Sequence, residues 1–315
     1  MQDYNFTKHV MKKILTRVLS PLLLRLRGTK NKWPVSRLIK GNMDLYESRH
    51  GYRFDVNNPT TFTEKLQWYK IYYDNGYLES VVDKALFKDY IQEKLGEGYT
   101  IPMYNVYSSI KELMADWDNL PEEFVLKSTL QSDGKFIEVI HKKSEVNKEK
   151  LKAEVKKWFN PYNTLINSFC RAYYRATPRV LAEQYMSQFN DQLNDYKFFC
   201  FNGQIECVYV AMDHFMEEDY PITFYDLEWN KLDVQYGKHK VGDAPKPKHW
   251  EEMKVLAQKL SQGFPFIRVD FFDTEERLYM AELTFYPGGG MTPYYPVSFN
   301  QKLGDLFILP NNTIK

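Results

Sequence analysis

The spacing of the apolar residues changes near Gly96 of this 315-residue chain, and the change limits the folds that the chain can adopt. Before Gly96, apolar residues recur every three or four positions, which is the period of an amphipathic helix. After it, most apolar runs are short and end at turn residues, which is typical of strands. We therefore expect an α+β protein, with a helical region over residues 1–80 and two α+β lobes over residues 81–182 and 183–315.

Capping residues locate two of the expected helices. Thr61 and Glu64 have the spacing of a capping box at a helix start, and Asp83 can cap a second helix, from Lys84 to about Leu95. Two later segments with a helical pattern span about 147–158 and 249–262. The expected strands are Phe124–Lys127, Phe136–Ile140, Val180–Tyr185, Tyr196–Phe201, Ile205–Met212, Thr223–Asp226, Ile267–Asp273 and Leu278–Leu283.

The charges are balanced over the chain but not along it. A net charge of +1 argues against a nucleic-acid partner, because dedicated nucleic-acid binders carry a large basic excess. Residues 1–30 hold seven basic residues against Asp3 alone, with apolar residues at helical spacing between them. Their uncharged run, Val18–Leu24, is too short to cross a bilayer. Two interpretations stay open: residues 8–27 form a helix that lies on an anionic membrane surface, or a helix that packs on the body.

Three cysteines, Cys170, Cys200 and Cys207, are too few and too irregularly spaced for a disulfide scaffold or a zinc site. We expect reduced thiols packed in a cytoplasmic protein, and the inner face of the membrane is the alternative location. The six histidines are scattered along the chain, and none is assigned a role.

The strongest group of chemically active residues lies near the C-terminus. Arg268 and Asp270 are two positions apart on an expected strand and so share one face, and Glu282 lies on the next strand. If the strands pair antiparallel, the two carboxylates approach each other and suit magnesium, which prefers oxygen ligands. Arg268 would then neutralise a developing oxyanion. The alternative is a salt bridge across two strands.

Two further groups of residues give weaker evidence for a binding site when each is taken alone. Lys127 ends a strand and precedes a polar loop that contains Ser132 and Gly134, which can hold phosphates, although a solvated hairpin explains the same pattern. Asp195 and Lys197 share one face of another strand and can meet ribose hydroxyls and phosphate. A cross-strand ion pair is the alternative for these two residues.

The order of these segments carries more information than any one of them. Along the chain, the candidate segments come in the order Asp83-Lys84, the Lys127 loop, Glu183–Met186, Asp195–Lys197, Arg268–Asp270, Glu282 and Pro287-Gly288. In this order they resemble the ATP-grasp superfamily, and the whole chain resembles its TupA-like branch, named for teichuronopeptide biosynthesis. Asn58–Lys65 is similar to the N-terminal signature of that branch, and the match runs from about residue 33 to 305.

The resemblance implies an ATP-grasp fold and an ATP site divided between the two lobes. Lys84 and Lys127 match the lysines that contact ATP phosphates, and the loop with Ser132 and Gly134 resembles the phosphate-covering loop. Glu183–Met186 resembles the interlobe hinge that reads adenine, through the Gln184 carbonyl and the Met186 N–H. Asp195 matches the acid that binds ribose. These matched residues are Lys84, Lys127, Ser132, Gly134, Glu183, Gln184, Met186 and Asp195.

The resemblance also implies the reacting centre. Lys197 would face the phosphates, Asp270 and Glu282 match magnesium ligands, and Arg268 matches the arginine that steadies the acyl phosphate. Thr284 stands where many ATP-grasp enzymes have asparagine, and a hydroxyl is a weaker magnesium ligand than an amide carbonyl. The helical character of residues 1–80 is a second departure, because an α/β domain usually precedes the two lobes.

The implied function is an ATP- and Mg²⁺-dependent carboxylate–amine ligase. Its carboxylate and amine substrates would belong to a surface polysaccharide or its precursor, for example an amino acid and a uronic acid. A glycosyltransferase of capsule or lipopolysaccharide assembly is the first alternative. A non-catalytic nucleotide-binding scaffold is the second.

Overall fold

The computed structural model describes residues 34–76, 78–130, 136–160, 170–173, 176–186, 194–212, 220–274 and 276–311, without the side chains of Glu79 and Arg171. The predicted helix over residues 8–27, for which a membrane surface and packing on the body were both open, and the loop residues Ser132 and Gly134 lie outside this part. Within it, no helix is both long enough and apolar enough to cross a membrane.

The described part of the N-terminal region, from residue 34 on, is mainly helical, as its periodicity predicts. Its helices are α2 (Val35–His50), α3 (Phe62–Tyr72), α4 (Leu78–Val82) and α5 (Lys84–Leu95). The predicted capping box opens α3: Thr61 Oγ1 accepts from the Glu64 N–H, and a Glu64 oxygen accepts from the Thr61 N–H at 3.2 Å. Asp83 caps α5 by accepting from the N–H groups of Ala85 and Leu86, at 2.9 and 3.1 Å. Both predicted helix starts are therefore confirmed.

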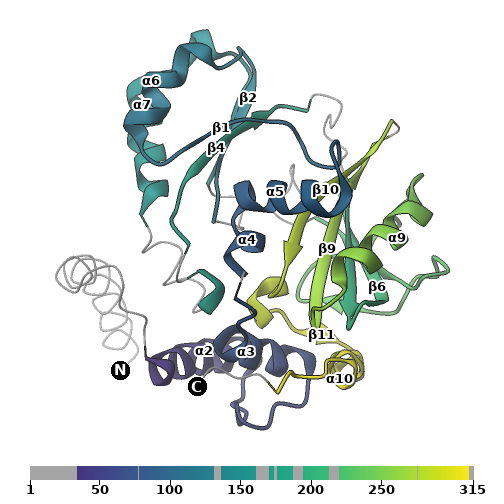
Figure 1. Ribbon diagram of the computed structural model, residues 1–315. Helices are drawn as coiled ribbons and strands as arrows, with labels where there is room; N and C mark the ends of the chain where they lie inside the picture. Colours follow the sequence, from purple (N-terminus) through teal and green to yellow (C-terminus); the bar gives the residue numbers. More distant parts are fainter. Residues whose placement is uncertain are drawn as a thin grey trace.

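The first sheet has four antiparallel strands in the order β1-β4-β2-β3. They are β1 (Met103–Tyr107), β2 (Phe124–Ser128), β3 (Ile137–Ile140) and β4 (Val180–Gln184). Helices α6 (Ile110–Asp116) and α7 (Lys148–Val155) lie beside this sheet in the upper part of the molecule (Figure 1). A core that includes Trp117, Phe124 and Trp158 joins the helices to the sheet. The sequence did not predict β1 or α6.

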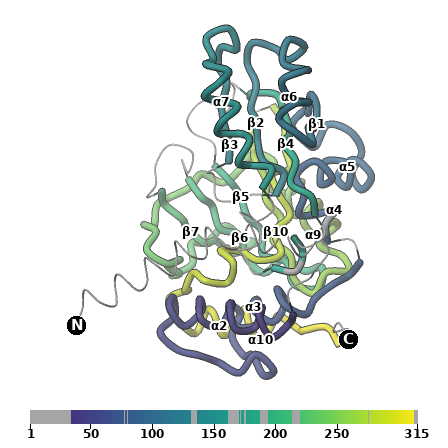
Figure 2. Tube along the Cα trace, turned by 90° about the vertical axis from the view of Figure 1, so that its left-hand side faces the viewer, coloured from purple at the N-terminus to yellow at the C-terminus, as the bar shows by residue number. Residues whose placement is uncertain are grey.

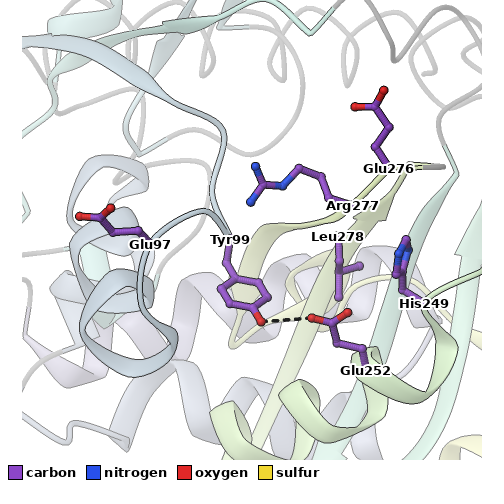
Figure 3. Close-up of a pocket in the computed structure, with 7 residues that line it drawn as sticks. All are labelled: Glu97, Tyr99, His249, Glu252, Glu276, Arg277 and Leu278. Carbon is purple, nitrogen blue, oxygen red and sulfur yellow. Dashed lines mark hydrogen bonds between the residues drawn. The ribbon is translucent and has the colours of Figure 1, made fainter.

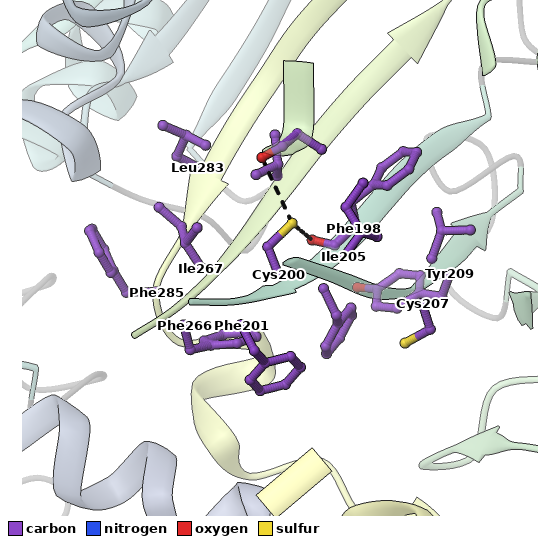
Figure 4. Close-up of a cluster of buried hydrophobic side chains, with 14 of the residues drawn as sticks. Phe198, Cys200, Phe201, Ile205, Cys207, Tyr209, Phe266, Ile267, Leu283 and Phe285 are labelled. Carbon is purple, nitrogen blue, oxygen red and sulfur yellow. Dashed lines mark hydrogen bonds between the residues drawn. The ribbon is translucent and has the colours of Figure 1, made fainter. Parts of the chain in front are cut away.

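The second sheet has five antiparallel strands in the order β10-β9-β5-β6-β7. They are β5 (Asp195–Phe201), β6 (Gln204–Ala211), β7 (Ile222–Tyr225), β9 (Phe266–Asp273) and β10 (Leu278–Thr284). The β5–β6 hairpin turns at Asn202 and Gly203, whose φ angles of 50° and 78° suit its tight turn. Helix α9 (Trp250–Ser261) packs its apolar side on one face of this sheet, over the core shown in Figure 4.

The two ends of the described chain meet beneath the second sheet. After β10 come the turn η6 (Pro287–Gly290), the short strand β11 (Tyr294–Tyr295), which pairs with β8 (Gln235–Tyr236), and α10 (Val297–Leu306). Helices α2, α3 and α10 form the lowest layer in both views (Figures 1 and 2). Gly304 of α10 packs directly on the backbone of Thr60, which leaves no room for a side chain.

The three cysteines are buried and are not joined in disulfides, as the cysteine count predicts. Cys200 points toward α9, and its sulfur donates weakly to the Phe198 carbonyl at 3.8 Å (Figure 4). Cys207 lies across the β5–β6 hairpin in the same core. Their role in the described part of the chain is therefore packing.

Candidate functional site

Four charged side chains gather on one face of the second sheet. Asp195 and Lys197 come from β5, and Arg268 and Asp270 come from β9. The register sets Lys197 opposite Asp270, and strand alternation turns all four side chains to the same face. Lys197 pairs with Asp195 and, at 3.0 Å, with Asp270. The sequence predicted these pairs of residues separately, and the structure brings them into one buried cluster.

Arg268 is held by bonds on several sides. Its Nε and Nη2 donate to the two oxygens of Asp270, at 2.7 and 2.5 Å, in a bidentate arrangement. Nη1 donates to the hydroxyl of Tyr209 at 3.1 Å, and Nη2 also donates to Thr284 Oγ1 at 3.0 Å. The guanidinium therefore has a fixed orientation, which a flexible lysine would not have.

The pKa of Asp195 is shifted in the opposite direction from that of Asp270. Burial raises the pKa of Asp195 to about 6, and the ion pair with Lys197 opposes this rise without cancelling it. Burial would also raise the pKa of Asp270, but Arg268 and Lys197 outweigh burial and lower that pKa. Asp195 Oδ1 is buried and has no hydrogen-bond partner within the described residues. It is an acceptor that a ligand hydroxyl would satisfy.

Two more predicted residues lie on the neighbouring edge strand. The pairing of β9 with β10 sets Glu282 opposite Asp270 and Thr284 opposite Arg268, across a bulge near Met280. The predicted antiparallel pairing of the two strands is thus present, and two carboxylates lie on adjacent strands. In the described ranges, no three His, Cys, Asp or Glu side chains gather closely enough to hold a metal by themselves.

A second buried network ties the first sheet to α5. Glu183 of β4 pairs with Lys127 of β2 through one oxygen and with Lys88 of α5 through the other, at 3.0 Å. Lys88 also donates to the Ile101 carbonyl at 2.6 Å. Burial would raise the pKa of Glu183, but Lys127 and then Lys88 outweigh burial and lower it. Sequence reasoning missed Lys88, although it lies one helical turn after Lys84.

The start of α5 is fastened beside the end of β2. The Lys84 N–H donates to the Thr129 carbonyl at 2.9 Å, and the Thr129 N–H donates to the Arg179 carbonyl at 2.9 Å. The Arg179 guanidinium completes the link by pairing with Asp83 at 3.0 Å. The lysines at positions 84 and 127 therefore come from adjoining elements, although 43 positions separate them in the sequence.

The predicted hinge joins the two sheets. The Gln184 N–H ends β4 by donating to the Pro102 carbonyl at 2.9 Å. Met186 then packs in a small apolar cluster with Ile101, Phe272 and Tyr279. Phe272 lies on the same strand face as Arg268 and Asp270, so an apolar wall adjoins the charged cluster.

One surface hollow of about 250 Å³ lies away from all these residues. It is formed by Glu97 and Tyr99, the start of α9 and the β9–β10 hairpin (Figure 3). Tyr99 donates to Glu252 at 3.1 Å across it. None of the site residues predicted from the sequence lines this hollow.

The family model described as TupA-like ATPgrasp matches residues 64–308. The chain belongs to the TupA-like ATP-grasp family. The resemblance predicted from the motif order is confirmed, and so is the α+β ATP-grasp fold. No curated protein matches the sequence of this chain.

Solved structures similar to this TupA-like protein are distant from it. A D-alanine–D-alanine ligase from Helicobacter pylori has 17% identity and a TM-score of 0.40, over 73% of this chain and 61% of that one. The enzyme of that name from Bacillus anthracis has 15% identity and a TM-score of 0.44, over 78% and 73%. N5-carboxyaminoimidazole synthetase from Staphylococcus aureus, complexed with ADP, has 14% identity and a TM-score of 0.38, over 74% and 54%. This chain thus spans less than two thirds of two of these relatives.

Proposed function

We propose that this TupA-like ATP-grasp protein is an ATP-dependent carboxylate–amine ligase that works through an acyl phosphate. The observation that carries the proposal is the buried cluster in which Asp270 orients Arg268 and Lys197 on one sheet face. Fixed cations in a desolvated site stabilise developing negative charge far better than mobile ones in water. Family membership supplies ATP as the phosphoryl donor.

In this proposal the nucleotide lies between the two sheets. The free Oδ1 of Asp195 accepts a bond from a ribose hydroxyl. The Gln184 carbonyl and Met186 N–H read adenine, beside the apolar wall that contains Phe272. The phosphate contacts would come from Lys84, Lys127 and Lys197, with the loop of Ser132 and Gly134 over them. When the nucleotide binds, Lys127 would break its ion pair with Glu183 and bind a phosphate instead.

The residues present also fit magnesium. Asp270 and Glu282 carry carboxylates at paired positions of β9 and β10, which suit a hard cation that keeps phosphate oxygens in its shell. Because both Asp270 oxygens accept from Arg268 and one of them also accepts from Lys197, Asp270 would exchange one of these bonds for the ion. They would hold the ion, with the Thr284 hydroxyl as a weaker third donor. Bound there, magnesium would neutralise charge on the phosphoryl group. Because Thr284 already accepts from Arg268, its larger role is to orient the guanidinium.

The proposed reaction has two steps. A substrate carboxylate oxygen attacks the γ-phosphorus, so that an acyl phosphate forms and the bond to ADP breaks. An amine then attacks the acyl carbon, phosphate leaves, and the amine loses a proton. Arg268 neutralises the oxyanion of the second step, and no side chain acts as a nucleophile.

We further propose that the carboxylate and the amine belong to a surface polysaccharide or its precursor. A uronic acid joined to an amino acid is one such pair. The support for this substrate class is the TupA-like branch itself. We propose a cytoplasmic location and lobes over residues 81–182 and 183–315. The first sheet extends two residues past this boundary, because its strand β4 ends at Gln184.

The test is to incubate the protein with Mg²⁺-ATP and pairs of uronic acids and amino acids. We expect ADP, phosphate and an amide product, detected by mass spectrometry, only when both substrates are present. Asp270→Asn should abolish turnover, whereas Asp243→Asn, an exposed aspartate elsewhere, should not. Sugar transfer from a nucleotide sugar, without ADP release from ATP, would instead establish the glycosyltransferase.

A further inference from the structure

Lys70 of α3 is a buried lysine whose hydrogen bonds within the described residues go to neutral acceptors. Its side chain is 1% exposed. Nζ donates to Gln67 Oε1 at 3.2 Å and to the Gly289 carbonyl at 3.1 Å, and no carboxylate of the described residues pairs with it. A buried ammonium without a counter-charge costs stability, so folding alone does not explain why a cation occupies this position.

The acceptor of Lys70 belongs to a turn of three consecutive glycines. Gly288, Gly289 and Gly290 have φ angles of 55°, 62° and 68°, in the left-handed region that favours glycine. Glycine has no intrinsic preference for one conformation, so neighbouring groups must fix the turn. Gln67 Nε2 donates to the carbonyls of Gly289 and Gly290, at 3.1 Å each. Side chains of α3 thus hold the glycine turn from one side, by donating to the carbonyl oxygens of the turn.

The other side of the glycine turn is linked to Arg268 through two tyrosines, Tyr236 and Tyr209. Gly288 lies so close to the Tyr236 hydroxyl that a Cβ would collide with it. The Tyr236 ring stacks on Tyr209, with ring centroids 5.7 Å apart. The Tyr209 hydroxyl accepts from Arg268. The turn also follows Thr284, which binds Arg268, after only two intervening residues.

We infer that Lys70 and Gln67 are positioning residues that hold the glycine turn against Tyr236, as a fixed wall of the substrate site beside Arg268. The inference rests on the proposed ligase function. Bonds from a cation to a carbonyl are stronger than neutral ones, which gives an ammonium an advantage over an amide in fixing glycine backbone. A small displacement of such a wall would separate the amine from the acyl phosphate.

Lys65 provides a matched control on the same helix. Its Nζ also donates to two backbone carbonyls, those of Gly304 at 2.8 Å and Phe307 at 3.0 Å. These carbonyls lie at the end of α10, away from the glycine turn. Replacing Lys65 with methionine therefore removes the same kind of bond without loosening the wall beside Arg268.

The experiment compares Lys70→Met and Gln67→Met with Lys65→Met by backbone hydrogen exchange and by kinetics. We expect faster exchange at residues 288–292 in the first two variants only. With substrates that support turnover, kcat should fall roughly 10- to 100-fold in these variants, while the KM for ATP stays within about twofold. Lys70→Arg, which restores a cation, should recover part of kcat.

The inference would be overturned if hydrogen exchange at residues 288–292 matched the wild type in both Lys70→Met and Gln67→Met. An unchanged kcat in both variants, or an equal loss in Lys65→Met, would also overturn it. If the wild-type protein shows no ligase turnover, the proposed function fails, and the exchange measurement still decides whether Lys70 and Gln67 hold the turn. Because Gln67→Met keeps the buried charge, it tests the inference even if Lys70→Met does not fold.

Discussion

At the scale of single residues, the site depends on charges that are buried together. Arg268 and Lys197 are kept in place by Asp270, which in turn keeps its own charge because of them. Asp195 is less fully compensated than Asp270, because it has one ion pair and one oxygen without a hydrogen-bond partner among the described residues. Each residue of the cluster is therefore sensitive to the protonation of its neighbours.

The raised pKa of Asp195 predicts a pH-dependent affinity for ATP. Its pKa of about 6 in the folded protein exceeds the ordinary 3.8, so the folded state binds the extra proton between these values. On account of Asp195, folding stability decreases as the pH rises through that window. The carboxylate that accepts the ribose hydroxyl is lost below about pH 6, so ATP should bind more weakly at pH 5 than at pH 7.

Titration calorimetry at several pH values between 5 and 7.5 checks this prediction, and an affinity that does not change across this range would contradict it. In Asp195→Asn the affinity for ATP should be lower, and it should change less between pH 5 and 7 than in the wild type. The change that remains comes from the terminal phosphate of ATP, whose last pKa is also about 6. Asp233→Asn, at an exposed site, should titrate like the wild type.

At the scale of elements, Glu183 joins a helix to a strand. It is the shared partner of Lys88 on α5 and Lys127 on β2, and it lies near the end of β4 as the first residue of the predicted hinge. Helical spacing can place Lys84 and Lys88 on one side of α5. It cannot show that a carboxylate about 95 positions later lies between that helix and a strand.

Glu183→Gln should destabilise the fold. The substitution leaves two largely buried lysines without their counter-charge, and breaking a buried ion pair typically costs about 3–5 kcal/mol. Urea unfolding measures this change. Glu154→Gln, which breaks an exposed pair with Lys157, should cost less than about 1 kcal/mol, and equal losses in the two variants would contradict the role given to Glu183.

At the scale of the whole molecule, the sequence predicted the elements with strong local signals and missed those that depend on packing. The capping residues Thr61 and Asp83 and the expected strands were found in place. Strand β1 was missed because its central residues are exposed and lack apolar alternation. Helix α10 was missed because two of the four residues on its buried side, Asn300 and Gly304, are not apolar. The burial of Lys70 was also unpredictable, since α3 is buried on nearly all sides.

The candidate site likewise combines residues that local patterns predict with an arrangement that they do not predict. Asp195, Lys197, Arg268 and Asp270 were found from their alternation on two strands, because a strand fixes which side chains share a face. Their convergence depends on the pairing of β5 with β9, which are separated by more than 60 residues. No local pattern contains that information. The order of the motifs does contain it, because that order matches a known family.

The contact between α10 and α3 predicts how the two ends of the described chain depend on each other. Gly304→Ala would push a methyl group into the Thr60 backbone, which cannot move without disturbing the cap of α3. We expect a loss of about 1–3 kcal/mol in thermal or urea unfolding. Ser298→Ala, on the exposed side of α10, should change stability by less than about 0.5 kcal/mol, and comparable losses would show that the close packing is unimportant.

The burial of the three thiols has a practical consequence for labelling. Cys170, Cys200 and Cys207 are each at most 3% exposed, and burial raises the pKa of Cys200 to about 12 and holds that of Cys207 well above its usual range. A thiolate is the reactive species, so maleimides should modify the native protein very slowly. A single cysteine introduced on the surface would therefore carry a fluorophore selectively, without removal of the natural thiols. The natural thiols would in turn report every event that opens the core.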